Sequence, residues 1–113
     1  MSDKQPGAWE AIDRLRRRID EIDRHLLDLL NARARCVAEV GQIKKESGNM
    51  SLYQPERERE IFDAVVSANP GPLSGRAIRR LFECILDESR SVERSIMESA
   101  PIDPPGSEKD SGR

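Results

Sequence analysis

The first half of the chain carries apolar residues at helical spacing. They recur every three or four positions over most of the stretch from Ile12 to Ile43, and neither Gly nor Pro interrupts the run before Gly41. This heptad-like repeat predicts one long helix, over about residues 8–46, with a single apolar seam along one face. The seam consists of Ile12, Leu15, Ile19, Ile22, Leu26, Leu29, Cys36, Val40 and Ile43.

This seam is longer than one short chain can easily cover. A helix of that length measures roughly 55–60 Å at about 1.5 Å per residue. A compact globule of this chain length has a radius of gyration of only about 13 Å. We therefore expect self-association into a homodimer, with the long helices of two copies packed against each other.

Two shorter helices are predicted in the second half of the chain. Pro55 suits the first position of a helix, where its missing N–H costs nothing, and apolar residues follow it at helical spacing. The sequence Asn-Pro-Gly-Pro at residues 69–72 ends that helix. Ser74 is a good N-cap for a third helix, which continues to about Glu98. The predicted fold class is therefore all-α, with one long helix and two shorter ones.

The two ends of the chain differ from its middle. Residues 1–7 form a short polar lead, and residues 99–113 are rich in Pro, Gly, Ser and charged side chains. Such segments bury too little apolar surface to fold, so both are predicted to be disordered. The expected organisation is one helical domain at residues 8–98 between these two ends.

Composition excludes several classes of protein. The net charge of −2 gives no basic signal for nucleic acid. No stretch approaches the roughly 18 apolar residues that a membrane span requires. The first residues lack the basic start and apolar run of a signal peptide, so a cytoplasmic location is expected by default.

Polar side chains interrupt the apolar face of every predicted helix. Arg33 occupies a position on the seam itself, and burying a cation without a partner or a bound anion is costly. Lys44 lies eleven residues further on, close to the same face and about 16 Å along the axis. The two side chains could converge on one small anion. Similar intrusions on the other two helices are Arg57, Glu58, Ser89 and Glu93.

Each of these residues also has an ordinary structural explanation. Arg57 could pair with Glu58 or Glu60, and Ser89 could be a small packing residue. Taken as a set, three cations, two carboxylates and a hydroxyl on inner faces favour a cationic pocket for a small di-acid. Arg16 is about 25 Å from Arg33 along the helix, so it could serve the same pocket only from a partner subunit.

Three segments resemble the all-helical chorismate mutases, which are small intertwined helical-bundle dimers of the shikimate pathway. They are LRRRIDEIDRHLLDLLNARARCVAEVGQIKKE at residues 15–46, YQPEREREI at 53–61 and IRRLFECILDESRSVE at 78–93. The resemblance covers nearly all of the predicted domain. It implies rearrangement of chorismate to prephenate, a unimolecular pericyclic reaction that needs no metal, cofactor or nucleophile.

The resemblance also implies roles for the polar residues on the inner faces. Lys44 and Glu93 would donate to the ether oxygen of the breaking bond, and Glu93 could do so only when protonated. Glu58 would accept a hydrogen bond from the ring hydroxyl. The substrate carboxylates would be bound by Arg33, Arg57 and Ser89, and by Arg16 from the other subunit.

Two positions depart from the best-known bacterial pattern of this family. Gln54 stands where Asp is common, so either its side chain or only its backbone would contact the substrate. Glu93 stands where several members have Gln, although Glu occurs in the family as well.

Two other functions remain open from the sequence. An isochorismate pyruvate lyase of the same fold would need similar cations for a similar dianion. A non-catalytic helical dimer that regulates another shikimate enzyme would instead have Arg33 and Arg57 in ion pairs. A partner enzyme of the shikimate pathway is also possible for the mutase itself.

Overall fold

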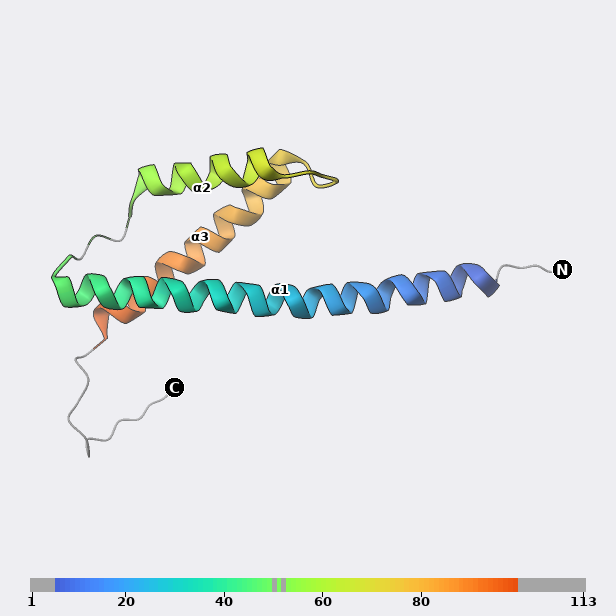
Figure 1. Ribbon diagram of the computed structural model, residues 1–113, viewed down its shortest axis with the longest axis horizontal. Helices are drawn as coiled ribbons and strands as arrows, with labels where there is room; N and C mark the ends of the chain where they lie inside the picture. Colours follow the sequence, from blue (N-terminus) through green and yellow to red (C-terminus); the bar gives the residue numbers. More distant parts are fainter. Residues whose placement is uncertain (1–5, 50, 52, 100–113) are drawn as a thin grey trace, which may run out of the picture. The chain divides into compact units, whose positions relative to one another are not determined.

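The computed structural model describes residues 6–49, 51 and 53–99 and contains three helices (Figure 1). They are α1 (Pro6–Ser47), α2 (Pro55–Ala68) and α3 (Gly75–Glu98), and no strand occurs among these residues. The all-α prediction is confirmed. Helix α1 begins two residues before the predicted start, and α3 ends at the predicted residue. Most of the predicted disordered lead and tail lies outside the described residues.

The chain divides into two units after Cys36, and helix α1 contributes to both. In the first unit, none of the side chains described between residues 7 and 36 is buried. The six seam residues from Ile12 to Leu29 keep 37–67% of their surface exposed. Because exposed apolar surface is unfavourable in water, burying this face against a packing partner would stabilise the protein.

The second unit holds the last turns of α1 together with α2 and α3. The only hydrophobic residues buried in the described part of the chain, Leu86 and Met97, both lie on α3. Gly41 on α1 is buried as well. A Cβ atom at Gly41 would lie 3.2 Å from Glu93 Cγ and 3.3 Å from Ile96 Cβ. The missing side chain therefore lets α3 side chains lie directly against the α1 backbone.

Local signals fix the ends of α2 and α3. Pro55 begins α2, and the Ser74 side chain accepts a hydrogen bond of 3.0 Å from the backbone N–H of Ala77. Between the two helices, the Asn69 side chain donates to the Leu73 carbonyl at 2.7 Å and accepts from the Gly71 N–H at 3.1 Å. These bonds replace the helical ones that are lost at the turn, so α2 leads directly into α3.

Helices α2 and α3 pack against each other beyond this turn. The guanidinium of Arg79 on α3 lies 4.3 Å from the ring centroid of Phe62 on α2, at cation–π distance. None of the described helices is long and apolar enough to cross a membrane.

Candidate active site

Lys44 and Glu93 meet where the end of α1 approaches α3. The Lys44 Nζ atom lies 3.2 Å from Glu93 Oε2, and the two side chains are only 12% and 9% exposed. Lys44 also donates to the carbonyl oxygen of Ser51 at 2.8 Å. The sequence singled out both residues as polar groups on apolar faces, and they come from segments about 50 positions apart. A buried charge of either sign without the other would be costly.

Two contacts hold the ammonium group of Lys44 in one position. Its Nζ has three N–H donors, of which the contacts with Ser51 and Glu93 use two. The remaining donor is available to an oxygen atom brought into the site. Gly41, one turn before Lys44, provides the space that Glu93 occupies.

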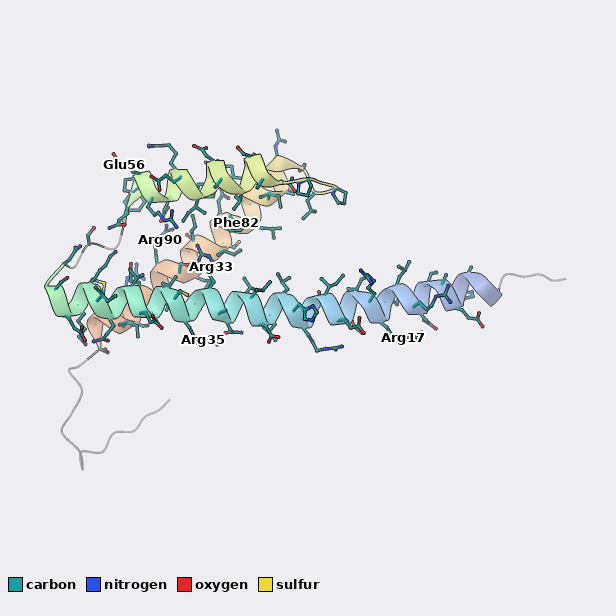
Figure 2. The ribbon with its side chains drawn as sticks, viewed as in Figure 1. Arg17, Arg33, Arg35, Glu56, Phe82 and Arg90 are labelled. Carbon is teal, nitrogen blue, oxygen red and sulfur yellow. The ribbon has the colours of Figure 1, made fainter. Side chains whose placement is uncertain are left out.

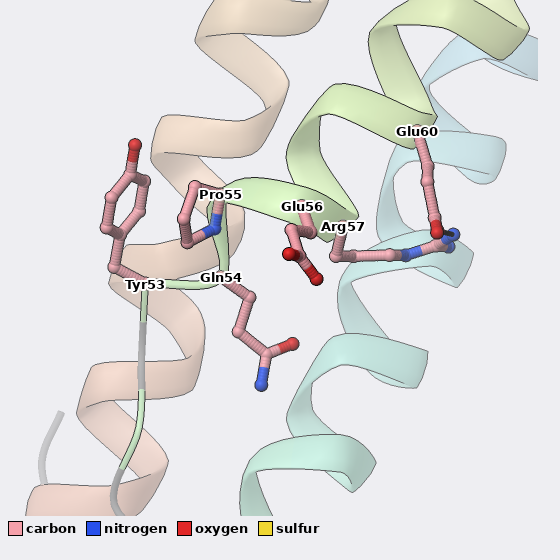
Figure 3. A pocket seen from close by; sticks show the side chains of 6 residues that line it. All are labelled: Tyr53, Gln54, Pro55, Glu56, Arg57 and Glu60. Atoms are coloured by element: carbon pink, nitrogen blue, oxygen red, sulfur yellow. Dashed lines mark hydrogen bonds and ion pairs between the residues drawn. The ribbon is translucent and has the colours of Figure 1, made fainter.

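A cavity of about 500 Å³ opens at the start of α2 (Figure 3). Gln54 and Arg57, both predicted site residues, are among the residues that line it. Gln54 is the N-cap residue of α2, and its side chain makes no capping hydrogen bond. The Arg57 side chain reaches toward Glu60, and its Nη1 lies 3.4 Å from Glu60 Oε1. This long contact between exposed side chains is weak, so an anion could displace it.

Glu58, the residue after Arg57, is bound by Arg90 of α3. Arg90 Nη1 donates to Glu58 Oε2, and its Nη2 donates to Asp87 Oδ1 one turn earlier on α3. The hydrogen bond to Glu58 raises the pKa of Arg90, so this guanidinium stays charged. Arg90 was missed in the sequence because it lies beside the apolar stripe. The sequence feature that could have pointed to Arg90 is the i, i+3 spacing between Asp87 and Arg90.

The other predicted site residues lie on α1 and α3. Ser89 on α3 is partly buried, and its Oγ donates to the carbonyl oxygen of Ile85 at 2.8 Å. Arg33 belongs to the first unit, where it is partly buried, as its place on the seam suggested. Arg16 belongs to the same unit and is exposed. No cluster of His, Cys, Asp and Glu in the described segments could hold a metal ion.

The described part of the chain holds three helices, a Lys44–Glu93 pair whose side chains are almost fully buried, and a cavity at the start of α2 that Arg57 helps to line. Residues 15–94 match the family model described as chorismate mutase type II, and the chain belongs to that family. The resemblance inferred from the three sequence segments is confirmed.

Comparisons with individual proteins agree with this family assignment. The chain is similar to a chorismate mutase structure (Form II) from Thermus thermophilus, with a TM-score of 0.71 and 37% identity over 74% of this chain and 94% of that one. It is 26% identical over 97 residues to the chorismate mutase of Methanocaldococcus jannaschii, covering 79% of this chain and 90% of that protein.

The chain also matches part of several longer proteins. The chain is 34% identical over 91 residues to a bifunctional chorismate mutase/prephenate dehydratase of Stutzerimonas stutzeri, covering 77% of this chain. The matched region is 25% of that relative, so the chain spans about a quarter of the bifunctional proteins it matches.

Proposed function

We propose that this chain catalyses the rearrangement of chorismate to prephenate, as a chorismate mutase acting in the biosynthesis of aromatic amino acids. The observation that carries the proposal is the Lys44–Glu93 pair, which sets two potential donors side by side in a nearly buried position. Family membership supports the same reaction. The matched family and relatives also favour a mutase over an isochorismate pyruvate lyase or a non-catalytic module.

The proposed role of Lys44 follows from the charge that develops during the reaction. Negative charge gathers on the ether oxygen as the C–O bond breaks, so a fixed cation there stabilises the transition state more than the ground state. The Nζ of Lys44 is already held by Ser51 and Glu93, which keeps the cost of orienting it small. Glu93 would be the second donor, and it can donate only in its protonated form.

Substrate binding supplies the rest of the rate enhancement. Chorismate is a flexible dianion, and only a compact conformer brings the reacting carbons together. We assign its carboxylates to Arg57 and Arg33, with Ser89 beside the ring carboxylate and Gln54 lining the entrance. Glu58 would accept a hydrogen bond from the ring hydroxyl. Arg57 would exchange its weak contact with Glu60 for a stronger one with substrate.

The active form in this proposal is a homodimer in which Arg16 reaches the site of the other subunit. The exposed seam of the first unit supports it, because a second copy of α1 would cover that apolar surface. A partner enzyme of the same pathway fits the proposal too, since bifunctional relatives join a chorismate mutase to a prephenate dehydratase.

The test is prephenate formation by the purified chain, with isochorismate assayed in parallel for pyruvate release. We expect prephenate from chorismate and no pyruvate from isochorismate. Lys44→Ala should lose most of the activity. Lys45→Ala is the matched control, because Lys45 donates to the backbone oxygen and the hydroxyl of Ser99 instead of reaching Glu93. An inactive wild-type chain, or equal losses in both variants, would contradict the proposal.

A further inference from the structure

Glu58 presents an electrostatic problem for the proposed site. A carboxylate that accepts a hydrogen bond from the ring hydroxyl must lie within a few ångströms of a substrate carrying two negative charges. Like charges at such distances repel each other appreciably, even at an effective dielectric constant of about 20. A bare Glu58 would therefore weaken the binding of the substrate that it is meant to orient.

The structure contains a side chain that removes this problem. Arg90 on α3, labelled in Figure 2, donates to Glu58 Oε2 on α2. The two side chains are 28% and 19% exposed. The other terminal nitrogen of Arg90 donates to Asp87 Oδ1, and its guanidinium lies 6.0 Å from the ring centroid of Tyr53. Contacts with three residues therefore hold this guanidinium, and the hydrogen bond from Arg90 uses only one of the two carboxylate oxygens of Glu58.

We propose that Arg90 is a positioning residue, which neutralises and orients Glu58 so that a carboxylate can face a dianionic substrate. This inference rests on the proposed function. In this role Arg90 does not touch the substrate, because both of its terminal nitrogens are engaged by protein carboxylates. Removing the charge of Arg90 alone would leave Glu58 as an uncompensated anion in the site. Removing the charges of both Arg90 and Glu58 would leave no such anion.

Arg79 supplies a matched control on the same helix. It also reaches from α3 to α2, where its guanidinium lies 4.3 Å from the centroid of Phe62. It is an exposed arginine that joins the same two helices through an aromatic ring rather than through Glu58. An effect that comes only from loosening the α2–α3 contact should appear in Arg79→Gln as well.

The experiment compares steady-state kinetics with chorismate for four proteins: wild type, Arg90→Gln, Glu58→Gln/Arg90→Gln and Arg79→Gln. We expect Arg90→Gln to raise KM about 10- to 100-fold with a smaller change in kcat, since the repulsion acts on bound substrate and transition state alike. The double variant should return KM to within about threefold of wild type, because its pair is again neutral and the glutamine that replaces Glu58 retains an acceptor oxygen.

Each outcome separates the inference from the function on which it rests. A wild-type chain that makes no prephenate overturns the proposed function. An active wild type in which Arg90→Gln matches Arg79→Gln, or in which the second substitution restores nothing, overturns the role of Arg90 alone.

Folding is checked by circular dichroism. If Arg90→Gln does not fold, the KM of the double variant is the deciding measurement. Both side chains of the pair are neutral in that variant, so neither leaves an unpaired charge. A KM close to wild type then supports charge neutralisation. A KM about tenfold higher or more than that of wild type overturns the proposal. Arg90→Lys should lie between wild type and Arg90→Gln, since it keeps the charge and loses the two-pronged geometry.

Discussion

Gly41→Ala tests how closely the donor pair depends on the approach of α1 to α3. A Cβ atom at this position would lie 3.2 Å from Glu93 Cγ, 3.3 Å from Ile96 Cβ and 3.4 Å from the Glu93 carbonyl oxygen. The last two atoms cannot rotate away, because Cβ and backbone positions are fixed by the helix. The crowding must therefore be relieved by moving α3, or by turning the Glu93 side chain away from Lys44.

Two effects on stability oppose each other. Alanine is favoured over glycine inside a helix by about 1 kcal/mol. Inserting a methyl group into a packed contact costs about 1–3 kcal/mol. We expect crowding to win at Gly41, giving a net loss of up to about 2 kcal/mol. The control is Gly7→Ala, since a Cβ at Gly7 in the same helix meets nothing within 4 Å.

The effect on catalysis should exceed the effect on stability. Displacing a catalytic group by about 1 Å can cost about 100-fold in rate, so a shift of a few tenths of an ångström should lower kcat several-fold. Thermal unfolding and steady-state kinetics of both variants measure the two effects. Our reasoning is wrong if Gly41→Ala is as stable and as active as Gly7→Ala, because Glu93 would then adapt without leaving Lys44.

Three further outcomes are expected. Lys44→Ala should lower kcat by about 100- to 1,000-fold, with Lys45→Ala near wild type; a change confined to KM would mean that Lys44 only binds substrate. The thermal midpoint should rise with protein concentration, and a fully helical monomer at micromolar concentration would refute the dimer. Refolding a mixture of inactive Arg16→Ala and Arg57→Ala chains should restore part of the activity, whereas no rescue would place Arg16 in the site of its own subunit.

The helices could be predicted from sequence because their signals are local. Apolar spacing indicated the course of α1, Pro55 marked the start of α2, and Ser74 capped α3 as expected. The start of α1 was placed two residues late because Pro6 is compatible with the first turn of a helix, where no N–H is needed. The seam also showed that one chain leaves a long apolar face exposed.

The site was predictable only where a polar residue interrupts an apolar stripe. Lys44 and Glu93 were identified in this way, although the apolar pattern did not show that their side chains would meet, and only the family resemblance implied that both face one oxygen. Arg90 was missed because it lies off the stripe, and its importance depends on which α2 residue faces it in the fold. Gly41 was noticed only as the end of an uninterrupted run, because a close approach between helices leaves no local signal.

The chemical identity of Glu93 leads to a final prediction, which concerns hydrogen-bond donors. In the structure Glu93 Oε2 lies 3.2 Å from the Nζ atom of Lys44. A carboxylate can only accept hydrogen bonds, whereas the neutral acid has an O–H to donate. A carboxylate would also repel the negative charge that develops on the ether oxygen. A side chain that always carries an N–H should therefore fill the donor role at this position.

Glu93→Gln tests this explanation. Glutamine has a similar size and always offers an N–H donor, so this variant should remain active. The measurement is kcat/KM for both enzymes under the same conditions. An inactive Glu93→Gln variant would exclude a donor role for Glu93. The pair would then serve only to hold Lys44 in place.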